Sequence, residues 1–333
     1  MTKTKVLLIF GGESSEHEVS IMSAKNVNQN VDREKFEIKL AYINKSGQWF
    51  SADDVAPSEK IPLKVDLRER AFMVGEEAYR PDVILPILHG KNGEDGMIAA
   101  VGQLISTRVV GSDMTASAVA MDKLLTKKVV EQDGVPTAPF RSLRQDGVRP
   151  SYDDLADVLG EGFFVKPTRE GSSVGVSKVT NQTELDAALN LAFEYDDTVL
   201  IERAMIGREL EAAVLGKGGD ILVSPVGEIL VDPGDNFYSY EAKYSDDSKT
   251  TTNVSASLDA ATEKQIQTMA RTVYQSLRCA GLARVDFFLV DGRPYFNEIN
   301  TLPGFTNISM YPKMMENGGL SQKDLITKLI ELA

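Results

Sequence analysis

The sequence predicts an α/β fold at its N-terminal end, followed by α+β regions built on antiparallel sheets. At the start, the apolar residues 6–10 precede two glycines and a helical pattern, which is the layout of a Rossmann-like strand–turn–helix unit. Near the other end, the apolar runs 283–290 and 294–299 flank an Asp291-Gly292 turn signal, which is typical of a β-hairpin. A parallel sheet is therefore expected first and an antiparallel sheet last.

Composition and charge limit the class of protein. The chain has 333 residues, which is enough for roughly two or three domains, and its 42% hydrophobic content is that of a globular protein. The net charge of −13 argues against nucleic acid or an anionic membrane as a partner. The single cysteine, Cys279, excludes an internal disulfide and suits a reducing cytoplasm. The first apolar run is too short for a signal peptide, and no run approaches membrane-spanning length.

The N-terminal region offers two candidate functional residues. Ser15 and Glu18 fit a capping box that opens the first helix, whose start would present free N–H groups to a ligand. Glu16 lies in that first turn, and the alternative is that it only complements the helix dipole. Further buried strands are expected at residues 38–43 and 83–88, whereas residues 51–80 cannot be placed. His89 follows the second of these strands, where open α/β sheets bind ligands, although a lone histidine is often structural.

The middle of the chain has the features of a phosphate site. Residues 112–134 are predicted to form one helix, which carries Lys123 and ends at Gly134. Residues 163–167 form a short strand that carries Lys166. The glycine- and serine-rich segment 169–179 follows, and it could wrap phosphate oxygens with backbone N–H groups and hydroxyls. No Walker sequence is present, and a plain hairpin turn is the alternative.

A long polar segment lies in the C-terminal half. Strands are expected at residues 199–203, 208–216 and 221–230, in an antiparallel sheet. Residues 237–252 are aromatic and charged without periodicity, which at this length indicates either a functional loop or disorder. Lys243 and Tyr244 lie in the middle of that segment. A helix at 259–278 then leads into the hairpin, and a last helix is expected at 321–332.

Four polar residues interrupt the apolar hairpin: Arg284, Asp286, Glu298 and Asn300. Three of them offer the hard oxygen ligands that Mg²⁺ prefers, and the fourth is a permanent cation. The alternative is a surface hairpin with solvated charges. Together with the lysines and the glycine-serine segment, they are the parts of a nucleoside triphosphate site, in which the protein mainly positions the reactants. The residues alone therefore indicate a Mg²⁺–ATP enzyme with an unknown acceptor.

The strand register of the hairpin tests that interpretation. With a regular two-residue turn, Asp286 faces Asn297, and Glu298 points to the opposite side of the sheet. If instead Gly292 sits in a left-handed bulge at the turn, Asp286 faces Glu298 and all four polar side chains share one face. A metal site requires the second register, which we predict.

Nine stretches extend the interpretation to a known family. In chain order they are GGESSEHEVS (11–20), HGKNGEDG (89–96), AMDKLLTK (120–127), VKPTREGSSVGVSKV (165–179), GRELEAAVLG (207–216), FYSYEAKY (237–244), ARVDFFL (283–289), NEINTLPGFT (297–306) and SMYP (309–312). In these motifs and their order, the sequence resembles the D-alanine–D-alanine ligase family of the ATP-grasp superfamily along nearly its whole length.

The resemblance implies an ATP-grasp fold with three domains. These are a Rossmann-like domain at 1–121, a central domain at 122–203 and a C-terminal domain at 204–333 with a mobile loop at 237–252. It also implies that ATP phosphorylates one D-alanine and that the amine of a second D-alanine attacks the acyl phosphate, for peptidoglycan precursor synthesis in the cytoplasm. The partners expected are ATP and D-alanine, and the expected assembly is a homodimer. The cofactors would be two Mg²⁺ per site, with Mn²⁺ as a possible substitute, and a monovalent cation.

Residue roles follow by resemblance. Glu16 would hold the ammonium of the first substrate, with His89 near its carboxylate, and Ser172 would link Glu16 to Tyr244 when the loop closes. The oxyanion would be stabilised by Arg284 and the Gly304 N–H. The carboxylate of the second substrate would meet Ser309 and Met310. The metal ligands would be Asp286, Glu298 and Asn300. The nucleotide would contact Lys123, Lys166, Ser173, Glu202, Arg203, Ala204, Met205, Glu209, Lys243 and Phe288.

Some alternatives and departures from the family pattern remain. A related ligase that uses D-lactate or D-serine second is the nearest alternative, although Tyr244 favours an amine nucleophile. A non-catalytic ATP-binding module and a dinucleotide oxidoreductase are more distant, since the four hairpin residues are retained and the dinucleotide fingerprint is absent. Ala99, Ala100 and Ala204 replace residues usual in the family, which puts nucleotide affinity in more doubt than catalysis.

Overall fold

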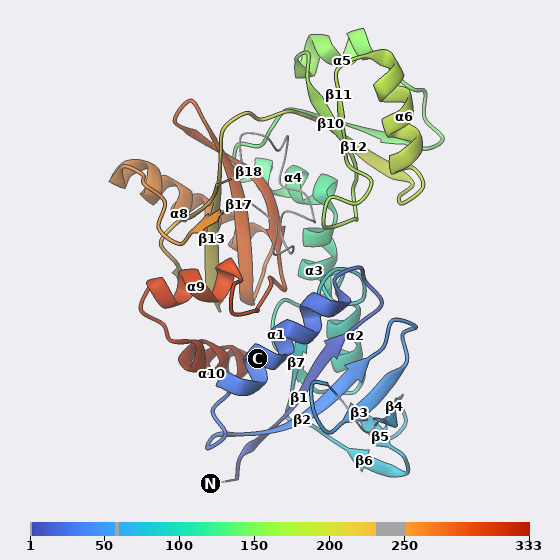
Figure 1. The fold of residues 1–333 in the computed structure, drawn as a ribbon, viewed down its shortest axis with the longest axis vertical. Coiled ribbons are helices and arrows are strands. Elements are labelled where there is room, and N and C mark those ends of the chain that lie inside the picture. The colour runs from blue at the N-terminus through green and yellow to red at the C-terminus, as the bar shows by residue number, and fades with distance from the viewer. Residues whose placement is uncertain (1, 57–59, 231–250) are drawn as a thin grey trace.

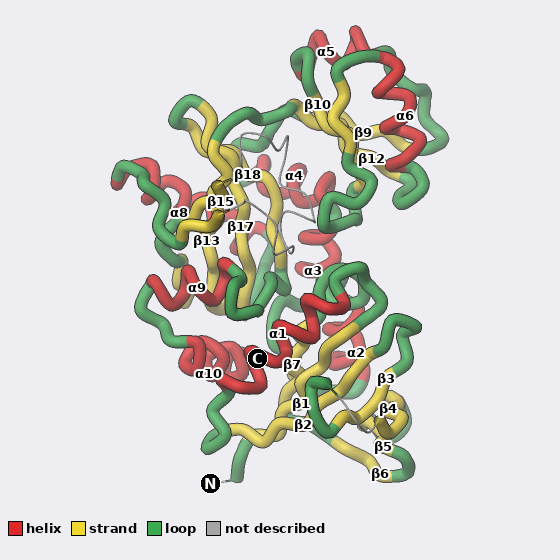
Figure 2. The backbone as a smooth tube through the Cα atoms, in the orientation of Figure 1, coloured by secondary structure: helices red, strands yellow, loops and turns green. Residues whose placement is uncertain are grey.

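The computed structural model describes residues 2–56, 60–230 and 251–333. Within these ranges the chain forms three β-sheets, each packed with its own helices, and the sheets follow one another along the long axis of the molecule (Figures 1 and 2). The predicted mixture of α/β and α+β regions is confirmed. No helix in the described part of the chain is long and apolar enough to cross a membrane.

The first sheet has eight strands in the order β6-β5-β4-β3-β2-β1-β7-β8. Strands β2, β1, β7 and β8 are parallel, and residues 51–80, which the sequence did not place, extend the sheet with antiparallel strands. The strands are β1 (Thr4–Gly11), β2 (Phe36–Ile43), β3 (Trp49–Ala52), β4 (Lys60–Asp66), β5 (Ala71–Val74), β6 (Glu77–Tyr79), β7 (Val83–Ile87) and β8 (Arg108–Val109).

Strand β1 is buried on both faces, which explains its uninterrupted apolar run. Leu8 and its even-numbered neighbours pack toward helix α1 (His17–Asn30), whereas Leu7 and Ile9 pack toward helix α2 (Met97–Leu104). The two helices thus cover opposite faces of the sheet. This arrangement brings the ends of β1 and β7, and so the loops that follow them, to the same edge.

The predicted capping box at the start of α1 is wrong. The N-cap residue is Glu16 rather than Ser15, and its side chain makes no capping hydrogen bond. A turn precedes the helix, in which the His17 N–H donates to the Ser14 carbonyl at 3.2 Å, and it delays the helix start. Glu18 instead points outward and forms an exposed ion pair with Lys45 at 2.9 Å.

The segment 112–134 forms two helices rather than the single predicted helix. These are α3 (Met114–Met121) and α4 (Lys123–Gln132), and the break falls at Asp122, whose backbone is extended. The Asp122 side chain caps α4 by accepting from the backbone N–H groups of Leu124 and Leu125, at 3.0 and 2.9 Å. Lys123 therefore lies at the N-terminus of a helix instead of within one.

The second sheet has the strand order β11-β10-β12-β9 and forms a separate body at the top of Figure 1. Its buried residues make a cluster of their own with helices α5 (Tyr152–Leu159) and α6 (Gln182–Ala192). The predicted strand at 163–167 is confirmed as β10. The strands are β9 (Phe140–Arg144), β10 (Phe163–Pro167), β11 (Ser177–Val179) and β12 (Thr198–Arg203).

The third sheet is antiparallel, with the order β16-β15-β13-β17-β18 and with β14 paired to β13. Helix α8 (Ala260–Ser276) packs on one face. Helices α9 (Met310–Asn317) and α10 (Gln322–Leu332) join this sheet to β1 and α1 in one continuous core. The strands are β13 (Arg208–Lys217), β14 (Asp220–Val223), β15 (Gly227–Leu230), β16 (Thr251–Asn253), β17 (Gly281–Val290) and β18 (Arg293–Asn300).

The hairpin register at the predicted site is confirmed, but the predicted position of the bulge is wrong. Asp286 faces Glu298, and Arg284 faces Asn300. The turn at residues 291–292 is a regular two-residue turn, because both residues take positive φ, 49° and 74°. The register instead shifts between Asp286 and Phe287, where β18 accommodates Asn297 as an extra residue.

Candidate active site

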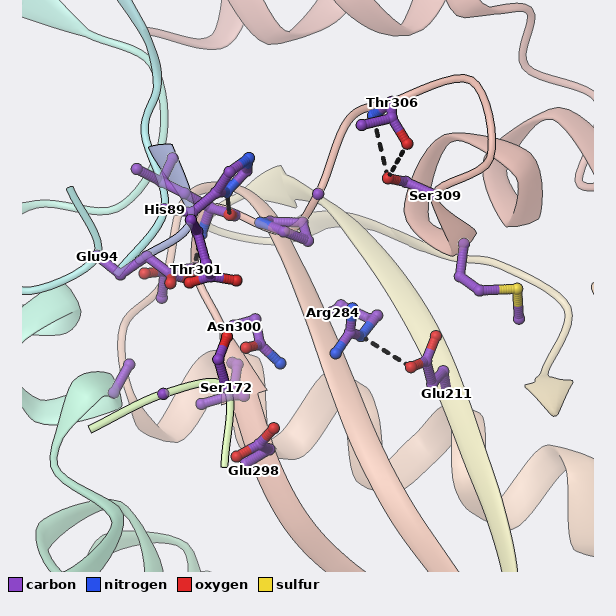
Figure 3. Close-up of a pocket in the computed structure, with 18 of the residues that line it drawn as sticks. His89, Glu94, Ser172, Glu211, Arg284, Glu298, Asn300, Thr301, Thr306 and Ser309 are labelled. Carbon is purple, nitrogen blue, oxygen red and sulfur yellow. Dashed lines mark hydrogen bonds and ion pairs between the residues drawn. The ribbon is translucent and has the colours of Figure 1, made fainter. Parts of the chain in front are cut away.

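Two adjoining cavities lie where the three sheets meet. The first, of about 360 Å³, is lined by Glu16, His89, Glu94, Gly304 and Ser309, among others, and we call this set the substrate side (Figure 3). The second, of about 210 Å³, is lined by Lys166, Ser173, Glu202, Met205, Glu209 and Phe288, among others, and we call this set the nucleotide side. Both cavities share the lining residues Lys123, Ser172, Glu211, Arg284 and Glu298.

Arg284 is the central cation of the shared wall. Its Nε and one terminal nitrogen donate to the two oxygens of Asp286, both at 2.7 Å. Its Nε also lies 3.2 Å from Glu211 Oε1, the contact drawn in Figure 3. Burial acts to lower the pKa of Arg284, but Asp286 and Glu211 outweigh it and raise the pKa well above its ordinary value. The guanidinium is therefore a permanent charge held in a fixed plane.

The oxygen-bearing side chains of the hairpin suit a hard cation. Asp286 and Glu298 project from facing positions, and the Asn300 amide donates to Asp286 Oδ2 at 3.1 Å. Glu298 lies 3.8 Å from Lys123 Nζ. Across the described ranges, no three His, Cys, Asp or Glu side chains cluster as a metal site. The set of two carboxylates and one amide matches Mg²⁺, which takes few protein ligands and keeps water and phosphate oxygens.

The nucleotide side contains a buried chain of three charges. Glu202 forms ion pairs with Lys127 and Lys166, both at 2.5 Å, and Lys127 is fully buried. Burial would raise the pKa of Glu202, but the two lysines hold it below its ordinary value. Burial lowers the pKa of Lys127, against the attraction of Glu202. Lys166 is thus held by a carboxylate at the place where a phosphate group is expected.

Lys123 and the glycine-serine segment meet between the two cavities. The Lys123 N–H donates to the Thr168 carbonyl at 2.9 Å, and its Nζ donates to the Glu170 carbonyl at 2.5 Å. Ser172 and Ser173 take positive φ, 51° and 61°, which is uncommon for residues other than glycine. Such backbone conformations cluster at ligand-binding loops. The segment is a connection between β10 and β11, but one with an unusual backbone that reaches both cavities.

Carboxyl groups are concentrated on the substrate side. The Glu94 carboxylate accepts from the Gly90 N–H at 2.9 Å and from the Leu302 N–H at 3.3 Å. Burial, and then the negative charge of Glu16, raise the pKa of Glu94 to about 7. A Cβ at Gly304 would lie 2.9 Å from Ser309 Oγ, so a larger residue at this loop position would displace the Ser309 side chain. Ser309 also accepts from the Thr306 N–H at 3.0 Å, immediately before Met310 begins α9.

The structure places most of the predicted site residues around the two cavities. Arg203 lines the nucleotide side, although its Nε donates to the Leu159 carbonyl at 2.8 Å. Ala204 lines neither cavity in the described chain, and its N–H donates to the Gly162 carbonyl at 3.0 Å. Lys243 and Tyr244 lie outside the described residues, as do residues 237–250 of the predicted loop. Thr252, in β16, lines the substrate side.

Sequence reasoning missed Glu94, Lys127 and Glu211. Lys127 and Glu211 are charged residues at positions that the local pattern marks as buried, whereas Glu94 lies in a polar loop and is half-buried. Lys127 follows Leu124 by one helical turn, and both side chains are buried. Glu211 lies in the apolar strand β13. For Lys127 and Glu211, a charge at an apolar position was the available signal, because buried charges persist only when they are paired.

The chain matches two family models, which together cover most of it. The model described as D-ala D-ala ligase N-terminus matches residues 5–112, and the one described as D-ala D-ala ligase C-terminus matches residues 129–331. Among curated proteins, a D-alanine–D-alanine ligase from Proteus mirabilis is 43% identical over 100% of this chain and 96% of its own length. One from Lactobacillus delbrueckii is 44% identical over 99% of this chain and 95% of its own length.

Solved structures give the same result. The D-alanine–D-alanine ligase from Coxiella burnetii is 35% identical with a TM-score of 0.89, and the alignment covers 99% of this chain and 95% of that one. A D-Ala:D-Ser ligase from Enterococcus faecalis is also 35% identical, with a TM-score of 0.90 and 99% of each chain covered. The site geometry, the family models and these relatives agree, and this chain therefore belongs to the D-alanine–D-alanine ligase family, with the ATP-grasp fold.

Proposed function

We propose that this protein is an ATP-dependent ligase that joins two D-alanine molecules to D-alanyl-D-alanine for peptidoglycan precursor synthesis. The observation that carries the proposal is the shared face of β17 and β18. There, Arg284 and the carboxylates of Asp286 and Glu298 lie between a lysine-lined cavity and a carboxylate-lined cavity. A phosphoryl donor fits the first cavity, and an amino acid with its ammonium group fits the second.

In the first step, a carboxylate oxygen of one D-alanine attacks the γ-phosphorus of ATP. The bond from phosphorus to the bridging oxygen breaks, which gives an acyl phosphate and ADP. Glu16 holds the ammonium of this D-alanine, and His89 lies near its carboxylate. Lys123 and Lys166 bind the phosphates, while Ser173, Arg203, Met205, Glu209 and Phe288 surround the nucleoside. Lys243 belongs to this proposal as the γ-phosphate contact.

In the second step, the free amine of another D-alanine attacks the carbonyl carbon of the acyl phosphate. Negative charge develops on the carbonyl oxygen, where Arg284 and the Gly304 N–H stabilise it. Phosphate then leaves, the nitrogen loses a proton, and the peptide bond remains. Ser309 and Met310 position the carboxylate of this second substrate. Closure by Tyr244 through Ser172 excludes water, which would otherwise hydrolyse the acyl phosphate.

The side chains of Asp286, Glu298 and Asn300 suit Mg²⁺. When bound, Mg²⁺ would neutralise the charge of the ATP phosphates and so reduce their repulsion of the attacking carboxylate. We propose two ions per site, with Mn²⁺ as a substitute and a monovalent cation as an activator. We also propose a division into domains at residues 121 and 203 and a cytoplasmic location.

We further propose a homodimer that forms through helices α2 and α3. Three large apolar side chains on these neighbouring helices are about half exposed: Met97, Leu104 and Met114. Light scattering on the purified protein should give twice the chain mass, and Leu104→Glu should give the mass of one chain. A single-chain mass for the unaltered protein would contradict this part of the proposal.

Phosphate release and product analysis test the activity. In the presence of ATP, Mg²⁺ and D-alanine, the protein should release phosphate and form the dipeptide. With L-alanine in place of D-alanine, it should do neither. D-lactate and D-serine, each added with D-alanine, distinguish the related ligases. A depsipeptide as the main product at neutral pH, or a mixed D-Ala–D-Ser product in excess over D-Ala–D-Ala, would contradict the assignment. Phosphate release that is independent of D-alanine would contradict ligase function altogether.

A further inference from the structure

The loop after β18 is held by side chains from the N-terminal sheet and its helix. This loop, residues 301–305, carries the Gly304 N–H that the proposed mechanism uses. On one side of Gly304, the Glu94 carboxylate accepts from the Leu302 N–H at 3.3 Å, and His89 Nδ1 lies 2.9 Å from the Leu302 carbonyl. On the other side, Ser23 Oγ accepts from the Phe305 N–H at 3.1 Å. Both flanks of the glycine are thus anchored.

The same side chains are anchored in turn within the N-terminal region. Glu94 uses its second oxygen to accept from the Gly90 N–H at 2.9 Å. Ser23 projects from α1 and is fully buried. Asn26, one turn later on α1, donates to the Phe305 carbonyl at 2.9 Å. The loop is therefore fixed from two N-terminal elements, α1 and the loop after β7.

The proton on His89 can be assigned from these contacts. Because Nδ1 faces a carbonyl, it must donate, so Nε2 of the neutral ring is an acceptor. The Ser23 hydroxyl lies 3.3 Å from Nε2 and donates to it, which leaves the serine oxygen free to accept from Phe305. Burial lowers the pKa of His89, against the charge of Glu16, and so favours the neutral ring that this network needs. Ser23 thus orients the histidine and the loop together.

We propose that Ser23 and Glu94 are positioning residues, which hold the backbone of residues 302–305 so that the Gly304 N–H points at the developing oxyanion beside Arg284. This inference rests on the proposed ligase function. Neither side chain needs to touch the reacting atoms, because each acts through a backbone group next to Gly304. The N-terminal region thereby contributes to the chemical step, although the metal and phosphate ligands lie elsewhere.

If Ser23 and Glu94 position the Gly304 N–H, their substitution should lower kcat and leave the KM for ATP nearly unchanged. A donor displaced by about 1 Å from a developing charge costs on the order of 10²-fold in rate, and a partial displacement costs less. Ser23→Ala removes one of several anchors, so kcat should fall about tenfold. The KM for ATP should stay within about twofold, because the loop contributes nothing to the nucleotide side.

Ser20 provides a matched control on the same helix. It is also fully buried, and its hydroxyl also bonds backbone groups, accepting from the Gly11 N–H at 2.7 Å and donating to the Ile87 carbonyl. Those partners belong to the N-terminal sheet rather than to the 301–305 loop. Ser20→Ala should therefore lower the melting temperature as much as Ser23→Ala does, while kcat stays within about twofold of the unaltered enzyme.

Glu94→Gln keeps the side-chain size but replaces one acceptor oxygen by a donor, so it cannot satisfy both N–H groups. It should lower kcat as Ser23→Ala does, and it still tests the proposal if the serine variant fails to fold.

The double variant should lose less kcat than the product of the two single losses, since both residues hold one loop. An equal fall in kcat for Ser20→Ala, or a loss confined to the KM for ATP, would overturn the proposal. Absence of ligase activity in the unaltered protein would instead refute the proposed function.

Discussion

The nucleotide side and the substrate side solve opposite electrostatic problems. On the nucleotide side, Lys127 and Lys166 share the Glu202 carboxylate, so the lysine that we propose binds phosphate already has an anionic partner. On the substrate side, burial and the negative charge of Glu16 raise the pKa of Glu94. In the proposed function, an incoming phosphate would compete with the Glu202 carboxylate for Lys166, whereas an incoming ammonium would meet the carboxylates of Glu16 and Glu94. We therefore expect the nucleotide side to bind weakly any anion that cannot displace Glu202 from Lys166. We expect the substrate side to favour a ligand that carries a positive charge.

Arg284 lies between the two sides and should show the largest effect. Arg284→Lys keeps the charge but loses the planar pair of bonds to Asp286, so kcat should fall by about 10²- to 10³-fold. Arg208→Lys is the matched control, because Arg208 makes the same two-bond contact to Glu228, at 2.6 and 2.8 Å, away from both cavities. Steady-state rates of phosphate release measure both. Similar losses in the two variants would show that the effect reflects ion-pair loss in general.

Lys127→Met should impair the nucleotide side and leave the substrate side nearly unchanged. It leaves Glu202 with Lys166 as its remaining cationic partner in the described site, so Lys166 is held more tightly and the KM for ATP should rise about tenfold. The unfolding free energy should fall by about 3 kcal/mol, because one partner of a buried ion pair is lost. The KM for D-alanine should change less than about twofold. Lys128→Met, at the exposed neighbouring position, should change neither constant, and an unchanged KM for ATP in Lys127→Met would remove Lys127 from the nucleotide side.

Stability in acid should depend on Asp196, which lies outside the lining of both cavities. Asp196 anchors the start of the glycine-serine segment, since it accepts from the Thr168 hydroxyl at 2.7 Å and from the Arg169 N–H at 2.9 Å. Burial acts to raise its pKa, but the bonds from Arg169 and Thr168 outweigh this and hold the pKa at about 2. A lowered pKa stabilises the fold above the unfolded value of about 4, and this contribution is lost as the pH falls toward 2.

Asp196→Asn should therefore lower the unfolding free energy at pH 6 by about 1 kcal/mol, a figure reduced for the solvent around the half-exposed Arg169. The difference from the unaltered protein should shrink below pH 4. Urea denaturation at pH 6, 4 and 3 measures it, with the exposed Asp197→Asn as control. A difference that is constant over this pH range would show that Asp196 contributes through packing rather than charge.

The smallest effect that we expect is a release of protons near neutral pH when D-alanine binds on the substrate side. The pKa of Glu94 is raised to about 7, so this carboxyl is about half protonated at pH 7. An ammonium bound at Glu16 removes part of the cause and should release up to about half a proton at that pH. Calorimetry of D-alanine binding in two buffers of different ionisation enthalpy measures the release, which Glu94→Gln should abolish. Equal release by both proteins would place the titrating group elsewhere.

A structural feature could be predicted from the sequence when residues close together in the chain determine it. Strand β10 was predicted because an apolar run sets it locally. The facing of Asp286 and Glu298 was predicted from the requirement of a metal site, and the position of the bulge that produces it was not. The helix break at Asp122 was missed although its cap on α4 is local, because the contact from the Lys123 N–H to the Thr168 carbonyl, just after β10, joins residues that are distant in the chain. Lys127 and Glu211 were missed because their partners are distant in the chain. The anchoring of residues 302–305 by Ser23 likewise joins elements 282 positions apart.

The bulge at Asn297 also bears on how the hairpin tolerates changes in length. It places Asn297 and Glu298 on the same cavity wall, although neighbouring residues of a strand normally point to opposite sides. The outer part of the hairpin, from Phe287 through the turn, is thereby one step out of phase with the inner part. A deletion of Asn297 would restore regular pairing and leave Glu298 facing Asp286, whereas a deletion of Ile299 would turn Asn300 toward α8. Deletion of the bulge residue should therefore be tolerated better than a deletion or insertion between Glu298 and Asn300, which would move Asn300 off the face that it shares with Asp286.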